Sequence, residues 1–139
     1  MYARKFYKLY WKVKIMGYRS DVMAVFYTYD LDEFPSIKLF IDENMPEWFR
    51  GDEYMSTFTG SNNLQGIKFD LQGVKWYQSY PDVKGFEQAL EKFKKLADEG
   101  NKWNWEFVRL GEEVEDVEEQ HSYNSNNLIY VSRSIESDY

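Results

Sequence analysis

Residues 22–29, Val-Met-Ala-Val-Phe-Tyr-Thr-Tyr, constrain the fold of this chain more than any other stretch. The run is dominated by β-branched and aromatic residues, which is typical of a strand that is largely buried. A polar segment, residues 17–21, precedes it, and Asp30 and Asp32 lead into a helical pattern. A strand buried on both faces lies in the interior of a sheet, so we expect later strands to pair along both of its edges.

The composition indicates a folded single domain. Of the 139 residues, 43% are hydrophobic and 19% are aromatic, which is far too apolar for a disordered chain. No stretch has the apolar length of a membrane span, and residues 1–15 are interrupted by Lys throughout, unlike a signal peptide. The chain has no Cys, which excludes disulfides, thiolate nucleophiles and Cys-rich zinc sites. We therefore expect a cytoplasmic protein without membrane association.

The charge is unevenly distributed along the chain. Residues 1–15 carry five basic residues and no acidic residue, whereas residues 16–139 carry 12 basic and 24 acidic residues, a net charge of −12. An acidic body repels phosphate backbones, so nucleic-acid binding is not expected. Two interpretations stay open: an ordinary acidic surface, or an acidic face that imitates a polyanion for a basic partner.

The first fifteen residues form a separate unit in the pattern. Residues 5–15 alternate between apolar and mainly basic side chains, which predicts a half-exposed strand, with a helix as the alternative. Met16 is a candidate second start codon. We therefore divide the chain into a basic N-terminal strand or arm, residues 1–15, and a single α+β domain, residues 16–139.

Two helices are predicted. Apolar residues recur at helical spacing over residues 34–45, with Asp32 as the N-cap and Pro46 as the stop. The stronger helix begins at Asp82 and ends at Gly100, and its apolar stripe consists of Val83, Phe86, Leu90, Phe93 and Ala97.

The remaining strands complete the predicted sheet. Residues 47–64 show no periodicity and predict a long loop, whereas residues 67–71 and 74–77 flank Gln72-Gly73, a two-residue hairpin signal. Three further strands are predicted at residues 103–110, 114–121 and 128–135. The element order gives an α+β fold: an antiparallel sheet with two helices on one face, a ferredoxin-like β-α-β-β-α-β core extended by a C-terminal β-hairpin. A different α+β layering of the same elements is the alternative.

Three blocks of the sequence resemble a known group of proteins. Residues 16–22, Met-Gly-Tyr-Arg-Ser-Asp-Val, resemble the opening of a group of small, uncharacterised bacteriophage and prophage proteins. Residues 74–83, Val-Lys-Trp-Tyr-Gln-Ser-Tyr-Pro-Asp-Val, and residues 106–112, Glu-Phe-Val-Arg-Leu-Gly-Glu, are similar to further blocks of that group. The group typically begins at the position of Met16, so residues 1–15 depart from it. The resemblance implies a phage origin and brings no established activity.

The sequence indicates no catalytic or metal site. The eight glycines are scattered and do not form a phosphate-binding loop. His121 is the only His, and its position beside a polar loop predicts a surface residue. The acidic run over residues 112–119 lacks the spacing and the turning Gly of a calcium loop, and a charged strand edge explains it better. We therefore expect no metal, no cofactor and no enzymatic activity.

Aromatic residues and arginines are the candidate binding residues. Arg109 and Arg133 each lie on an apolar strand face, where a guanidinium needs a carboxylate or an aromatic ring. Arg109 is therefore predicted either to form a buried ion pair, with Asp21 or Asp70, or to face a ligand. Residues 18–21 have the same two interpretations, a local turn or a ligand contact. The candidate binding residues are Tyr18, Arg19, Asp21, Trp76, Tyr77, Trp103, Trp105, Arg109 and Arg133.

The expected function follows from these exclusions and from the resemblance. We expect a non-enzymatic phage protein that binds a host protein, such as an inhibitor of a host or anti-phage defence factor. The alternative is a small-molecule or nucleotide-binding module that uses a sheet face rich in Arg and aromatic residues. A third class, an enzyme with paired carboxylates, has no motif in its favour. Homo-oligomer formation stays open.

Overall fold

The computed structural model describes residues 17–100 and 102–131. The basic arm, Arg133 and the second half of the strand predicted at residues 128–135 lie outside this part of the chain. In the part that is described, none of the helices has the length and apolar character needed to cross a membrane.

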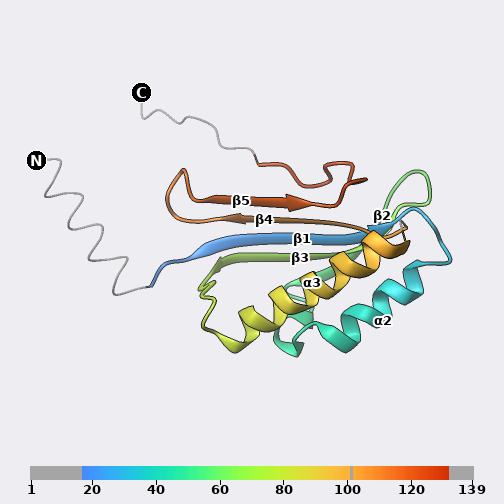
Figure 1. Cartoon of the computed structure of the whole chain (residues 1–139). Coiled ribbons are helices and arrows are strands. Elements are labelled where there is room, and N and C mark those ends of the chain that lie inside the picture. Colours follow the sequence, from blue (N-terminus) through green and yellow to red (C-terminus); the bar gives the residue numbers. More distant parts are fainter. Residues whose placement is uncertain (1–16, 101, 132–139) are drawn as a thin grey trace, which may run out of the picture.

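A five-stranded antiparallel sheet with two helices on one of its faces makes up the fold (Figure 1). In chain order the elements are β1 (Ser20–Thr28), α2 (Phe34–Asn44), the 3₁₀ helix η1 (Glu47–Arg50), β2 (Met55–Thr59), β3 (Gln65–Val74), α3 (Pro81–Gly100), β4 (Asn104–Leu110) and β5 (Val117–His121). The strands lie in the order β2-β3-β1-β4-β5. The predicted α+β class, with two helices over an antiparallel sheet, is thereby confirmed.

β1 lies at the centre of the sheet, as its apolar composition predicts. β3 pairs with one edge and β4 with the other, both antiparallel. Val22, Ala24 and Phe26 are part of the core under the helices, whereas Val25 and Tyr27 alternate with them and face the opposite side. All five are buried, so both faces of β1 are covered.

The core between the sheet and the helices consists largely of aromatic rings. Phe26 contacts Phe69 and Phe93 edge-on, with ring centroids 5.8 Å and 4.8 Å apart. Every residue of the apolar stripe predicted for α3 is buried. Burial of one such side chain stabilises a fold by roughly 1.5–3 kcal/mol, so this stripe attaches α3 firmly to the sheet.

The predicted helix ends are correct to within one residue, but their caps differ. α3 begins at Pro81, a residue that suits a first helical position because it has no N–H to satisfy. The N-cap of α2 is Glu33 instead of Asp32, and its side chain makes no capping hydrogen bond. The N–H of Asp32 donates to the Asp30 carboxylate at 2.9 Å, which places Asp32 in a local turn.

The predictions for residues 47–77 are wrong in two respects. The expected loop contains η1 and the edge strand β2, and the expected hairpin of residues 67–71 and 74–77 is a single strand, β3, up to Val74. The hairpin in this region joins β2 to β3 through Asn62 and Asn63, which have φ values of 60° and 64°. Asn tolerates this left-handed conformation, and the pair forms the tight turn that the twist of a hairpin favours.

Gln72-Gly73 forms a β-bulge inside β3. Ser20 pairs with Val74 and Val22 pairs with Leu71, so Asp21 lies opposite two residues. Gly73 has a φ of 60°, and its N–H donates to the Asp21 carboxylate at 2.8 Å. Gly73 therefore has the positive φ that a hairpin glycine would have, but the extra residue is absorbed within the strand because Asp21 accepts its hydrogen bond.

The C-terminal hairpin also differs from the prediction. β5 pairs with β4, but residues 128–131 are not in a strand. The N–H groups of Leu128 and Ile129 donate to the carboxylate of Glu106 in β4 at 3.0 Å and 2.8 Å. Residues 126–131 therefore lie on the sheet face opposite the helices and do not extend the edge of the sheet (Figure 1).

Candidate binding site

A cavity of about 360 Å³ lies where β3 ends and α3 begins. Aromatic side chains form much of its wall, and basic, amide and acidic groups converge on the same space. We call it the aromatic pocket and define it by Arg19, Trp48, Phe49, Tyr54, Gln72, Gly73, Val74, Lys75, Trp76, Tyr80, Asp82 and Val83.

The helix η1 supplies one wall of the aromatic pocket. Phe49 is buried and packs against Trp76 and Phe86, with ring centroids 5.8 Å and 5.2 Å apart. The neighbouring Trp48 is 50% exposed, and its ring lies 4.9 Å from that of Tyr54. Phe49 thus holds η1 on the core and leaves the Trp48 ring at the surface.

The connection from β3 to α3 supplies the opposite wall. The Trp76 ring lies 5.3 Å from the ring of Phe86, which fixes it against the core. Tyr80 is 41% exposed and contacts Tyr77 at a centroid distance of 5.1 Å. The carbonyl oxygen of Tyr80 accepts a hydrogen bond from the N–H of Lys84 at 3.0 Å. Tyr80 is therefore held by the first turn of α3.

Arg19 and Lys75 bring positive charge to the aromatic pocket. Nη1 of Arg19 donates to the carbonyl oxygen of Gly73 at 2.7 Å, and the backbone N–H of Arg19 donates to Glu112 at 2.8 Å. The bulge at Gly73 therefore orients the guanidinium. Asp82 is the one acidic residue in the lining, so the lining residues carry a net charge of +1.

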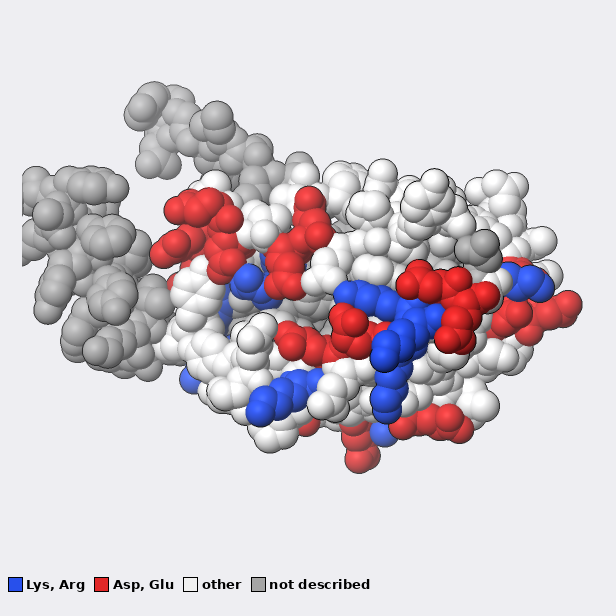
Figure 2. Space-filling model, viewed as in Figure 1, with Lys and Arg blue, Asp and Glu red and all other residues white. Residues whose placement is uncertain are grey.

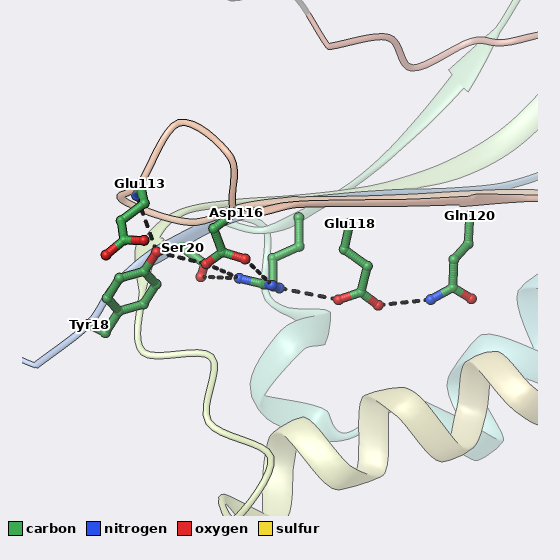
Figure 3. Close-up of polar contacts among 7 residues, drawn as sticks. Tyr18, Ser20, Glu113, Asp116, Glu118 and Gln120 are labelled. Atoms are coloured by element: carbon green, nitrogen blue, oxygen red, sulfur yellow. Dashed lines mark hydrogen bonds and ion pairs between the residues drawn. The ribbon is translucent and has the colours of Figure 1, made fainter.

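Arg109 belongs to an internal network on the helix-facing side of the sheet (Figure 3). Its Nη2 donates to Oδ1 of Asp116 at 2.7 Å, its Nε to Glu118 at 3.3 Å and its Nη1 to the hydroxyl of Ser20 at 3.2 Å. The hydroxyl of Tyr18 donates to Oδ2 of Asp116 at 2.7 Å. The hydrogen bond with Asp116 is the main reason why the pKa of Arg109 is raised.

The predicted ion pair of Arg109 is present, but with other partners. Asp21 accepts from the N–H of Gly73, and Asp70 accepts from the side chain of Gln72 at 2.7 Å. The partners of Arg109 come from β5 and the turn before it, because β5 pairs directly beside β4. The side chain of Arg109 is only 18% exposed and is used within the fold.

Trp105 is part of the protein interior, and Trp103 is half-buried against the core. Trp103 stacks on Phe93 at a centroid distance of 4.8 Å, and its Nε1 donates to Glu33 at 3.0 Å. Trp105 is buried, with the Nζ atom of Lys94 lying 4.7 Å from the centre of its ring. The sheet face that was predicted to offer Trp and Arg to a ligand is covered by the helices.

The structure divides the predicted binding residues into three sets. Arg19 and Trp76 line the aromatic pocket, and Tyr77 lies next to it, where its hydroxyl accepts a hydrogen bond from the N–H of Tyr18 at 2.6 Å. Arg133 lies outside the described residues. The set used within the fold consists of Tyr18, Asp21, Trp103, Trp105 and Arg109.

Sequence reasoning missed ten of the twelve residues that line the aromatic pocket, among them Trp48, Tyr54, Lys75 and Tyr80. One feature of the sequence could have indicated the exposed ring of Trp48. Trp48 and Phe49 are adjacent and follow Pro46, which ends a helix, and only one of two adjacent rings can face the core.

Among the described residues, no cluster of three or more His, Cys, Asp or Glu is arranged to hold a metal ion. Comparisons with models of protein families, with curated proteins and with solved structures find no match for this chain.

Proposed function

We propose that this protein acts by binding a partner protein through the aromatic pocket. The observation that carries the proposal is the pairing of exposed rings, Trp48 and Tyr80, with the guanidinium of Arg19 in one cavity. Trp, Tyr and Arg are the residues that dominate protein-binding hot spots. Trp48 contacts the buried Phe49 at a centroid distance of 5.0 Å, and Tyr80 contacts Tyr77 at 5.1 Å, so the two rings lose little conformational freedom on binding.

The charges of the aromatic pocket indicate the chemistry of the partner. Arg19 and Lys75 provide positive charge in a domain whose net charge is −12 over residues 16–139. Acidic side chains gather instead over the turn between β4 and β5 (Figure 2). We therefore expect the partner to insert an apolar or aromatic side chain that has a carboxylate beside it.

We propose further that the protein is encoded by a phage and acts in the host cytoplasm. There it binds a host protein, such as an anti-phage defence factor, and inhibits it without catalysis. The support is the resemblance to phage proteins together with the location of the resembling blocks. Residues 74–83 supply the wall between β3 and α3, and residues 16–22 supply Arg19. The third block, residues 106–112, carries Arg109 and the Glu112 carboxylate bonded to the backbone of Arg19.

We also propose that the fold is ferredoxin-like. We assign β1, α2, β2, β3, α3 and β4 to a ferredoxin-like core, to which β5 adds an edge strand. The order β-α-β-β-α-β along the chain and the sheet order β2-β3-β1-β4, with every neighbouring pair antiparallel, support this assignment.

The size of the cavity favours one alternative, a small-molecule or nucleotide-binding module. A volume of about 360 Å³ falls in the range of small-ligand sites, which is roughly 300–1,000 Å³. A planar ring against Trp48 or Trp76, with an anionic group near Arg19 and Lys75, would use the same residues.

Affinity capture from a bacterial lysate, combined with native mass spectrometry, tests both candidates. A captured protein that is lost with Trp48→Ala and with Arg19→Ala supports partner binding. Leu39→Ala is the matched control, because Leu39 on α2 is 57% exposed and lies outside the aromatic pocket. A small ligand that co-purifies with the wild type and is lost with Trp48→Ala favours the alternative. Capture that is unaffected by Trp48→Ala and Arg19→Ala would contradict the proposal.

A further inference from the structure

Glu106 is a buried carboxylate on the sheet face opposite the helices. It is 2% exposed and lies in β4 between Val25 of β1 and His121 of β5. Among the described residues, no ion pair involves Glu106. Its oxygens accept hydrogen bonds from the hydroxyl of Tyr27 at 2.7 Å and from the N–H groups of Leu128 and Ile129. A buried carboxylate without a cation is stable only with such donors.

Two of the three donors come from residues 122–131, which follow β5 and which we call the C-terminal segment. The N–H of Asn126 donates to the hydroxyl of Tyr27 at 3.0 Å, and its side-chain amide donates to the hydroxyl of Tyr29 at 2.6 Å. The Tyr27 hydroxyl thus links the C-terminal segment to Glu106. These contacts use side chains of the sheet and not a strand ladder, so the attachment does not depend on an unpaired strand edge.

Packing beneath the C-terminal segment is incomplete. A cavity of about 240 Å³ lies between Ile129, Tyr130 and Val131 on one side and residues of the sheet, including Met23 and Val108, on the other. The cavity is partly open to solvent. The hydrogen bonds to Glu106 and Tyr27 therefore hold the segment more than the packing of its side chains does.

We propose that Glu106 and Tyr27 form a peptide-binding site, which residues 126–129 of the same chain occupy in this structure. The ligand class is a peptide in a turn conformation, like that at Asn127 with its φ of 53°, which offers two consecutive backbone N–H groups to a carboxylate and an apolar side chain to the cavity beside it. This site lies on the opposite sheet face from the aromatic pocket and does not depend on its function.

Covalent attachment explains why the chain's own segment fills the site. A short tether gives a local concentration in the millimolar range, so a free peptide of equal intrinsic affinity competes poorly with it. Weakening the attached segment without altering Glu106 or Tyr27 should therefore make the site accessible to a peptide added in solution.

The full-length Ile129→Pro variant provides this condition, because Pro removes the N–H that donates to Glu106 at 2.8 Å. The probe is a labelled peptide with the sequence of residues 123–131, Tyr-Asn-Ser-Asn-Asn-Leu-Ile-Tyr-Val. We expect it to bind Ile129→Pro at least tenfold more tightly than it binds the wild type. Adding Glu106→Gln to that variant should abolish binding, since an amide accepts at one atom only. Equal binding with and without Glu106→Gln would overturn the proposal.

Hydrogen exchange on the single variant Glu106→Gln tests the attachment directly, without Pro in the chain. The amides of Leu128 and Ile129 should exchange at least tenfold faster than in the wild type. The matched control is Glu119→Gln, an exposed carboxylate of β5, which should leave both rates unchanged. Unchanged exchange at Leu128 and Ile129 in Glu106→Gln would show that the carboxylate does not hold the segment.

Discussion

At the scale of single residues, Arg109 joins the start of β1 to the hairpin of β4 and β5. Its guanidinium bonds to Ser20 at the start of β1, to Asp116 before β5 and to Glu118 within β5. Replacing it with Ala would remove the guanidinium from two carboxylates. Because Asp116 is 30% exposed and Glu118 is 42% exposed, water can partly replace the guanidinium, unlike at a fully buried pair.

We expect Arg109→Ala to lower the free energy of unfolding by about 2 kcal/mol, the loss typical of hydrogen bonds to charged groups. Arg109→Lys should recover only part of this, since an ammonium group cannot bond to both carboxylates and Ser20 in one plane. Urea unfolding followed by circular dichroism measures both variants. Midpoints equal to that of the wild type would contradict a structural role for Arg109.

Two tyrosine hydroxyls give a prediction about alkaline pH. Burial is the main cause of the raised pKa of Tyr18 and of Tyr27, and each donates a hydrogen bond to a carboxylate. A raised pKa in the folded state means that the neutral phenol is favoured there. The stability it contributes is complete below the unfolded pKa, about 10, and is lost as the pH rises through the folded value.

The free energy of unfolding should therefore decrease above pH of about 10 in the wild type, and Tyr27→Phe should weaken that dependence. Urea unfolding between neutral pH and that range measures it. Tyr123→Phe serves as the control because Tyr123 is 98% exposed. If Tyr27→Phe has the same alkaline dependence as the wild type, ionisation of Tyr27 is not the cause.

At the scale of elements, the bulge in β3 is sensitive to one methyl group because of its backbone conformation. Gly73 has a φ of 60°, and a Cβ atom there would meet nothing within 4 Å. Gly73→Ala should therefore destabilise the fold by about 1–2 kcal/mol through backbone conformation alone. Gly51→Ala is the matched control, since it is equally open but has a φ of −72°. Thermal melts that coincide for the two variants would contradict this reading.

The sequence predicts those elements whose apolar pattern is strong. The apolar stripe of α3 and the apolar run of residues 22–29 predict α3 and β1 directly. β2 is not, because its side chains are mostly exposed or half-buried and give no alternation. The sequence predicts a hairpin turn at Gln72-Gly73, but a glycine with a positive φ suits a bulge equally well. Only the pairing of β3 with Asp21 of β1 decides between the two.

The sequence predicts only part of the binding site, because residues that are far apart in the chain form it together. Arg19 and Trp76 were identified by residue type, which needs no neighbours. The aromatic pocket combines them with Trp48 and Tyr80, which come from separate segments that meet only in the folded chain. Residues 128–131, the described part of the predicted C-terminal strand, do not form a strand because the Glu106 carboxylate, a tertiary partner, takes the N–H groups that a strand would have used.

At the scale of the whole molecule, the described elements all lie within residues 17–131. A chain that begins at Met16 keeps each of them, together with the contacts of Tyr18 and Arg19. We expect it to fold, with circular dichroism like that of the full chain. An unfolded product would show that residues 1–15 are required by the domain and would contradict the division at Met16.

The central position of β1 has a consequence for how the protein is made. Its neighbours in the sheet begin at Gln65 and Asn104, so both of its pairings join distant parts of the chain. A ribosome that adds roughly 5–20 residues per second needs roughly 4–16 s to pass from the end of β1 to the end of β4. Throughout that interval the most apolar strand has an unpaired edge. The nascent chain is therefore a natural client for chaperones, and slow, long-range closure of the sheet should limit its folding rate.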